Sequence, residues 1–226
     1  MSAEWQERTA ILLGEDALER LAVKKVIVFG LGGVGGYVVE ALVRVGVGNF
    51  TLVDGDTFVE SNLNRQILAT VDVIGRSKSA VAAERVKKIN PSAVVVSVEK
   101  FLTADNVADF RLQEYDYIVD AIDDVDAKVL LAVKAQEYSV PVVSSMGTGN
   151  KLSPSFKVAD VYKTSNCPLA RIMRKKLKVA GVKKLTVVYS DELPLLHTCG
   201  TVGSIAFVPA AAGLTLASKV TQDLIK

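Results

Sequence analysis

Cysteine is scarce in this sequence, and its placement excludes several classes of protein. The 226 residues include only Cys167 and Cys199, and no CxxC pair occurs. This excludes a four-cysteine zinc site and a disulfide-stapled scaffold. The first residues are polar and lack the apolar stretch of a secretory signal peptide, so we expect a cytoplasmic protein.

Long hydrophobic runs are also missing. The longest weakly polar run covers residues 202–217, with Pro209 inside it and polar residues interspersed. A membrane-spanning helix needs ~20 predominantly apolar residues. We therefore expect no membrane span, and we interpret this run as a buried strand followed by a helix, at a candidate subunit contact.

Neither sign of charge dominates the chain. There are 27 lysines and arginines against 25 aspartates and glutamates, a net charge of +2, which as a total argues against a strongly basic nucleic-acid binder. The basic residues are unevenly distributed, however, because ten of them lie between Lys151 and Val188, where Asp160 is the only acid. That segment carries +9 and the remainder −7. A patch so one-sided is typical of a polyanion-binding surface, although a solvated basic helix has the same composition.

What the chain has in abundance is short apolar runs that alternate with helical patterns. Half of the residues are hydrophobic and 23% are charged, which is ordinary for a globular protein. Strands are predicted at residues 25–30, 50–54, 93–98, 117–120 and 141–145, and helices at 34–45, 77–89, 104–112 and 125–138. Such alternation predicts an α/β fold, a Rossmann-like open and mostly parallel sheet with helices on both faces.

The C-terminal third continues with a different spacing. Strands are predicted at residues 156–162 and 185–190, a basic helix at 168–179 and a last helix at 209–224. We expect these strands to extend the same sheet. The chain would then be a single domain over 1–226, with a nucleotide-binding part in 1–150 and a basic C-terminal extension in 151–226.

A glycine-rich loop follows the first predicted strand and opens a helix. Its glycines are Gly30, Gly32, Gly33 and Gly35. Glycines there permit a tight turn and let backbone N–H groups approach a phosphate. Asp54 ends the next strand, where a carboxylate can hold ribose hydroxyls. Alone, these features fit a nicotinamide oxidoreductase or a nucleotide-sensing module equally well.

A polar and basic cluster follows Asp54 and favours a different chemistry. It comprises Asp56, Asn62, Arg65, Gln66 and Lys78. An oxidoreductase has no need of an amide, an arginine and a lysine beside the phosphates. Transfer at a nucleotide phosphorus does need them, because fixed cationic donors stabilise the charge on the phosphoryl oxygens.

Carboxylates also follow the fourth predicted strand. Asp123 lies where a carboxylate would hold Mg²⁺ against triphosphate oxygens. Asp124 is expected to cap the helix that begins at Val125.

In combination these motifs resemble the E1-like (ThiF/MoeB/HesA) family of ATP-dependent activating enzymes. The match includes GxGGxG at 30–35, DxD at 54–56, NxxRQ at 62–66, the lysine that follows, and DxxD at 120–123. The resemblance implies adenylation of a carboxylate with ATP and Mg²⁺ by a homodimer. It implies that Asp54 binds ribose, that Gln66 supports the site, and that Asp123 binds Mg²⁺. The residues that would act on the phosphates are Asn62, Arg65 and Lys78, with Arg8 reaching the ATP of the partner subunit.

The departures from the family pattern point to one branch. Sulfur-carrier activators usually carry two CxxC pairs on zinc, which this chain lacks. Residues 8–15, 158–165 and 168–174 are similar instead to tRNA threonylcarbamoyladenosine dehydratases. That resemblance implies ATP-dependent cyclisation, with loss of water, of the threonylcarbamoyl group on adenosine 37 of tRNA. An adenylating activator of a ubiquitin-like sulfur carrier is kept as the alternative.

The resemblance gives the basic segment a partner, tRNA. The residues expected to bind it are Arg171, Arg174, Lys175, Lys176 and Lys178. A sulfur-acceptor or desulfurase-system protein is a further candidate partner, and a monovalent cation a further candidate cofactor.

The two cysteines remain open as nucleophiles. Cys167 and Cys199 could form a thioester as in other E1 enzymes, but neither lies in a recognised motif, and inert residues are favoured. His197, two residues from Cys199, is expected to be an ordinary loop histidine.

Overall fold

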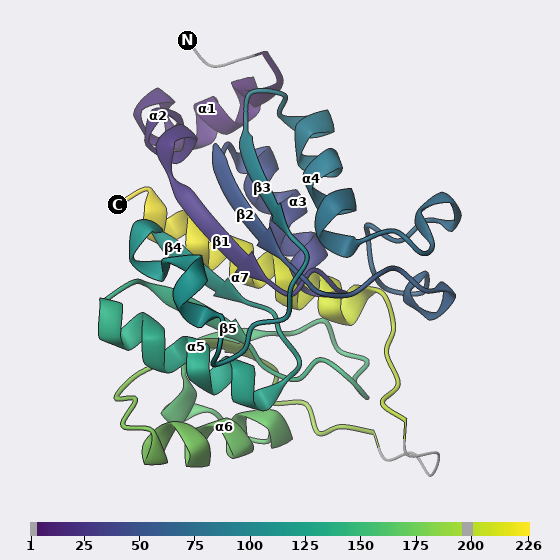
Figure 1. Ribbon diagram of the computed structural model, residues 1–226, viewed down its shortest axis with the longest axis vertical. Coiled ribbons are helices and arrows are strands. Elements are labelled where there is room, and N and C mark those ends of the chain that lie inside the picture. Colours follow the sequence, from purple (N-terminus) through teal and green to yellow (C-terminus); the bar gives the residue numbers. More distant parts are fainter. Residues whose placement is uncertain (1–3, 196–200) are drawn as a thin grey trace.

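Seven strands form one sheet in the computed structural model, which describes residues 4–195 and 201–226 (Figure 1). The strands are β1 Lys25–Phe29, β2 Asn49–Val53, β3 Val94–Val98, β4 Tyr117–Asp120, β5 Val142–Ser145, β6 Lys157–Asp160 and β7 Thr186–Tyr189. Their order is β3-β2-β1-β4-β5-β7-β6, and only β6 runs antiparallel to its neighbour. The predicted α/β fold is confirmed, including the extension of the sheet by the C-terminal strands.

Helices cover both faces of this sheet. They are α1 Glu7–Leu13, α2 Glu15–Val23, α3 Gly35–Val45, α4 Lys78–Ile89, α5 Val125–Tyr138, α6 Pro168–Val179 and α7 Phe207–Leu224. One face is covered by α3, α4 and α7, and the other by α5 and α6 (Figure 1). No helix in the described ranges is long and apolar enough to cross a membrane.

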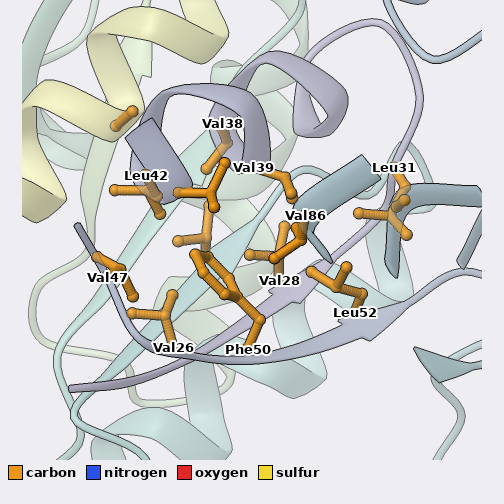
Figure 2. Close-up of a cluster of buried hydrophobic side chains, with 14 of the residues drawn as sticks. Val26, Val28, Leu31, Val38, Val39, Leu42, Val47, Phe50, Leu52 and Val86 are labelled. Carbon is orange, nitrogen blue, oxygen red and sulfur yellow. The ribbon is translucent and has the colours of Figure 1, made fainter. Parts of the chain in front are cut away.

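The core follows from the alternation of side chains along the central strands. On β1, Val26 and Val28 pack with Leu42 of α3, as Figure 2 shows, whereas Ile27 packs on the opposite face with Leu131 of α5. All five are fully buried. Burying a valine or leucine side chain contributes about 1.5–3 kcal/mol, so the continuous apolar runs read in the sequence stabilise both layers.

The order of the strands fixes where a ligand can bind. From β1 the chain builds β2 and β3 on one side, then returns to place β4 and β5 on the other. At such a switch point the loops after the strands diverge and leave a crevice at their carboxyl ends. The loop after β1 begins at Gly30 and the loop after β4 at Ala121, so both enter this crevice.

Two of the predicted elements are wrong. Residues 104–112 form a 3-10 turn at Val107–Phe110 rather than a longer helix. Asn106 binds the Thr103 N–H and the Phe101 carbonyl with its side chain, and such bonds compete with helix formation. Arg111 then adopts a left-handed conformation, with φ of 45°, which ends the turn.

The strand expected near residue 202 is also absent within residues 201–206, which the structure describes. Val202 is 68% exposed, so this segment is not a buried strand. Its backbone binds Asn64 and Asn150 instead of a neighbouring strand. The Asn64 side chain donates to the Ser204 carbonyl, and Asn150 accepts from the Gly203 N–H with its side chain and donates to the Gly203 carbonyl from its backbone. The helical part of the prediction is confirmed, since α7 begins at Phe207.

Candidate nucleotide-binding site

A cavity of about 1160 Å³ lies at the carboxyl ends of the strands, at the switch point. The sequence predicted residues from the loops after three strands and from the start of α4 for one site, and most of them line this cavity together. They are Gly30, Gly32, Gly33, Asp54, Asp56, Asn62, Arg65, Gln66, Lys78 and Asp123. Ligand sites usually enclose about 300–1,000 Å³, so this cavity can hold a nucleotide and part of a second substrate.

The glycines of the loop after β1 divide into two kinds. A Cβ added at Gly30 would lie 2.5 Å from the Ala121 carbonyl oxygen, and one added at Gly35 would overlap the carbonyl oxygen of Gly30. Gly35 does not line the cavity. A Cβ at Gly32 would meet only the Gln66 side chain, at 3.5 Å. Gly30 and Gly35 are therefore required by close packing of the loop, while Gly32 faces space that a ligand can use.

Asp54 fixes the same loop from β2. Its carboxylate accepts hydrogen bonds from the N–H of Leu31 at 2.6 Å and of Asp56 at 2.9 Å. Burial raises the pKa of the Asp54 carboxyl above its ordinary value, although these two N–H groups and the nearby Lys78 oppose the change. The carboxylate predicted to hold ribose therefore also joins the ends of β1 and β2.

Lys78 and Asp56 form an ion pair at the cavity wall. The lysine is the first residue of α4, and its Nζ lies 2.8 Å from Oδ2 of Asp56. A helix N-terminus already favours anions, and a lysine there adds a full positive charge. This combination suits a phosphate.

Asn62, Arg65 and Gln66 come from the segment that follows β2. The N–H groups of Arg65 and Gln66 both donate to the Asn62 carbonyl, which makes one compact turn of the three. Arg65 is held by the Ser61 carbonyl and the Asn64 side chain, each at 2.8 Å. Within the described residues Gln66 Oε1 is buried and has no partner. A buried acceptor is rarely left unpaired, so this oxygen is available to a donor on a ligand or to a water.

Asp123 lies between β4 and α5. It is exposed, and Asp124 beside it caps α5 by accepting from the Ala127 N–H at 2.8 Å, as predicted. No cluster of three or more metal-ligating side chains occurs in residues 4–195 and 201–226. A single carboxylate still suits Mg²⁺, which usually keeps its waters and takes its other ligands from substrate phosphates.

Some predicted residues lie outside the cavity. Arg8 is exposed on α1, and Gln6, two residues earlier, lies against Gly46 just ahead of β2. Figure 1 shows α1 at the amino ends of the strands, whereas the residues that line the cavity follow their carboxyl ends. Arg8 therefore does not reach the cavity of its own chain.

Cys167, the cysteine that the structure describes, does not line the cavity. It is free and buried. Cys199 and His197 lie outside the described residues.

The basic helix α6 begins at the cavity, since Leu169 in its first turn lines the wall. Of the residues predicted to bind tRNA, Arg174 donates to the Thr164 carbonyl at 3.0 Å and Lys176 pairs with Asp126. The other three are exposed and have no partner among the described residues. They are Arg171, Lys175 and Lys178.

One wall of the cavity consists of residues that no sequence motif had indicated. It is formed by residues 145–149, from the last residue of β5 onward, and by Thr201, Val202 and Ser204. The stretch Ser145-Met146-Gly147-Thr148-Gly149 follows a predicted strand and is rich in glycine and hydroxyl groups. Its position at a strand's carboxyl end was a usable signal.

Comparison with known proteins agrees with this geometry. The profile of the ThiF family matches residues 6–226. The tRNA threonylcarbamoyladenosine dehydratase of Bacillus subtilis is 36% identical over 97% of this chain and 94% of its own, and that of Escherichia coli is 41% identical over 99% and 83%. A solved structure of the Escherichia coli enzyme in complex with ATP has a TM-score of 0.91 and 36% identity, over 99% of this chain and 96% of that one.

Proposed function

The chain belongs to the ThiF family, and from this we propose that it is an ATP-dependent tRNA threonylcarbamoyladenosine dehydratase. It would adenylate the carboxylate of the threonylcarbamoyl group on adenosine 37 and then close that side chain into a ring. The observation that carries the proposal is the extent of the similarity to such dehydratases, because it covers α6 as well as the nucleotide site. We also propose that residues 1–226 form one adenylating domain, since all seven strands belong to one sheet.

The reaction divides into two balanced steps. A carboxylate oxygen of the substrate attacks the α-phosphorus of ATP, and pyrophosphate leaves. A nitrogen of the same side chain then attacks the acyl carbon, loses its proton, and AMP leaves. The net change in the nucleoside is the loss of one water. The nucleophile and the electrophile belong to one group, so proximity supplies much of the rate and no enzyme thiol is needed.

The residues of the cavity suit the first step. Lys78 and Arg65 can stabilise the negative charge that develops on the phosphoryl oxygens. The N–H groups of the glycine loop can hold the triphosphate, and Asp54 can accept from the ribose hydroxyls. Asn62 lines the same wall and can donate its amide to a phosphate oxygen.

Asp123 is the residue that would hold Mg²⁺. When bound, the ion would offset the negative charge of the triphosphate. Asp123 would supply one carboxylate oxygen to it from the loop after β4.

The tRNA would lie along α6. Arg171, Lys175 and Lys178 are free to contact phosphates, and the start of the helix at Leu169 would place the bound tRNA beside the cavity. Phosphate contacts of this kind would position the tRNA and make its binding dependent on salt.

A homodimer is part of the proposal. Ile11 and Leu12 on α1 are 79% and 81% exposed, beside Arg8. An exposed apolar pair on a short helix suits a contact with a second copy. Such a contact would let Arg8 act in the site of the partner subunit. The cytoplasmic location, a monovalent cation and a sulfur-acceptor or desulfurase-system partner remain predictions from the sequence.

The deciding experiment offers the chain ATP, Mg²⁺ and tRNA bearing threonylcarbamoyladenosine, and follows the mass of the released nucleoside. We expect the loss of one water together with AMP formation. The alternative, activation of a ubiquitin-like sulfur carrier, predicts no change in the nucleoside and AMP release that depends on a small carrier protein. The absence of both CxxC pairs counts against that alternative.

A further inference from the structure

A buried ion pair lies beneath the loop that carries Asp123. Lys128 of α5 is fully buried, and its Nζ lies 3.0 Å from Oδ1 of Asp120, the last residue of β4. Asp120 is 1% exposed. Neither residue lines the cavity, and the proposed reaction gives neither a role.

The pair binds both backbone groups of Ile122, its N–H and its carbonyl. Lys128 Nζ donates to the Ile122 carbonyl at 2.9 Å, and the Ile122 N–H donates to Asp120 Oδ1 at 3.1 Å. Asp123 is the next residue, and Asp124 after it is fixed as the cap of α5. Both neighbours of Asp123 are therefore anchored, which confines its backbone while its side chain stays exposed.

The same pair connects two further walls of the cavity. Ser144 on β5 donates to Asp120 Oδ2 at 2.6 Å, and the next residue, Ser145, lines the cavity. On the other side, a Cβ added at Gly30 would lie 3.0 Å from the Ile122 nitrogen, so the glycine loop packs on the same peptide. The loop after β4 and the end of β5 thus meet at one buried carboxylate and one buried amine, and the loop after β1 packs on the peptide that the pair holds.

Stability alone does not explain such a pair. Removing two charges from water is costly, and a well-packed apolar pair at the same place is often at least as stable. An apolar pair could not, however, satisfy both peptide groups of Ile122, which would be left without partners. The pair is suited to fixing a loop.

We infer that Lys128 and Asp120 are positioning residues that hold the Asp123 loop where its carboxylate meets Mg²⁺ and the triphosphate. The inference rests on the proposed function only through the role of Asp123 as a Mg²⁺ ligand. Partners that orient a metal ligand commonly change metal affinity by 10–100-fold when they are removed.

The test is a charge-neutral double variant, Asp120→Asn with Lys128→Met. The asparagine keeps an oxygen for the Ile122 N–H and an amide beside Ser144, while the methionine fills the space of the lysine stem without its amine. No unpaired charge is left in the interior, and the hydrogen bonds that disappear are those from the amine to the Ile122 carbonyl and to Asp120.

The measurement is calorimetric binding of ATP with and without Mg²⁺, and of AMP alone. In the double variant we expect the gain in ATP affinity that Mg²⁺ provides to fall about tenfold, and AMP affinity to change less than about twofold. The matched control is Glu40→Gln with Arg85→Met, which neutralises another acid–cation pair, between α3 and α4, away from the cavity. It should leave both affinities unchanged.

An unchanged Mg²⁺ effect in the double variant would overturn the inference. An equal loss of ATP and AMP affinity in that variant would also overturn it, and so would a wild-type ATP affinity that does not depend on Mg²⁺. If the double variant does not fold, Asp120→Asn with Lys128→Gln replaces it, because two neutral amides keep polar partners in the interior while the charged amine that holds the Ile122 carbonyl is removed. An unchanged Mg²⁺ effect in that variant would then overturn the inference. Because no tRNA is present, failure of the dehydratase proposal would appear separately, as an unchanged nucleoside mass.

Discussion

Lys78 and Asp56 form an ion pair in which only one partner is buried: the lysine side chain is 8% exposed and the aspartate 53%. The amine is held at a fixed place at the start of α4, on the wall of the cavity. A phosphate that enters the cavity finds this positive charge already in position, so little reorganisation opposes its binding.

We expect Lys78→Ala to lower the rate of AMP formation by about 10²–10³-fold, the usual effect of removing one preorganised donor. The folded state should persist, which circular dichroism checks. Lys88→Ala is the matched control, because Lys88 is exposed on the same helix and does not line the cavity. Wild-type turnover by Lys78→Ala would remove the role assigned to this lysine.

Gly32 and Gly35 should respond differently to the same substitution. A Cβ at Gly35 overlaps the backbone of Gly30, so Gly35→Ala should lower the free energy of unfolding by about 3 kcal/mol or more. A Cβ at Gly32 meets only a flexible side chain, so Gly32→Ala should change stability by less than about 1 kcal/mol. It should nevertheless weaken ATP binding, since it fills space beside the phosphates. Urea unfolding and ATP titration separate the two effects, and equal losses of stability would contradict the division of roles.

Arg8 can be tested by mixing two inactive variants. If Arg8 acts only in the partner's site, a dimer of one Arg8→Ala subunit and one Lys78→Ala subunit has one complete site. Random mixing in equal amounts should then restore about a quarter of wild-type AMP formation. The control mixes Lys78→Ala with Arg20→Ala instead of Arg8→Ala, because Arg20 is exposed on α2. No recovery on mixing the first pair would exclude action in trans.

Reversing the free charges of α6 should weaken tRNA binding. Arg171, Lys175 and Lys178 are exposed and unpaired within the described chain. Their change to glutamate should reduce the slope of log K against log salt by about 0.7–0.9 for each phosphate that the helix no longer binds. The control reverses Lys25, Lys88 and Lys100, which are exposed elsewhere. ATP affinity should stay constant in both. An unchanged slope in the α6 variant would return this helix to an ordinary solvated face.

Glu40 should make stability depend on pH in the acid range. Burial alone would raise the pKa of this carboxyl, but hydrogen bonds from Arg85 and Arg44 outweigh burial and hold the pKa below its ordinary value of 4.5. A lowered pKa in the folded state contributes stability above pH 4.5, and this contribution is lost as pH falls through the folded pKa.

Glu40→Gln should therefore lower the free energy of unfolding at pH 7 by about 1–2 kcal/mol, and the difference from wild type should shrink below pH 4.5. Denaturant unfolding across pH measures both. Glu84→Gln is the control, because Glu84 pairs with Arg76 at the surface and should matter by less than about 0.5 kcal/mol. A difference that does not vary with pH would show that Glu40 acts through packing instead.

The local patterns of the sequence were enough to predict most of the fold. The range predicted for α5 matches the structure, as does that for α6, because each has a clear start: Asp124 as a cap and Pro168 at the first position. The helix expected at 104–112 failed for a reason that is also local, since the side chain of Asn106 competes for the backbone. Its amphipathic pattern alone does not reveal that competition.

In the candidate site, too, some features could be predicted from the sequence and others could not. The glycine loop, Asp54 and Arg65 were found because each lies in a short motif that follows a strand, and parallel strands bring their carboxyl ends together. Lys78 was found because it begins the next helix after that motif. That Lys176 is engaged by Asp126 while Lys175 is free depends on how α6 packs beside α5, and nothing near either lysine in the chain indicates it.

By itself, then, the sequence determined the order of the elements, the glycine loop and the motif residues, because those depend on side-chain periodicity and on the chemistry of single turns. Only the tertiary structure decided that Lys128 is buried against Asp120, that Gln66 presents an unpaired oxygen, and that α1, which carries Arg8, lies at the opposite end of the sheet from the residues of the cavity. These facts depend on which strands become neighbours. From the helix pattern alone, Lys128 would be expected to be an exposed charge. It is buried because the fold places Asp120 of β4 beside it.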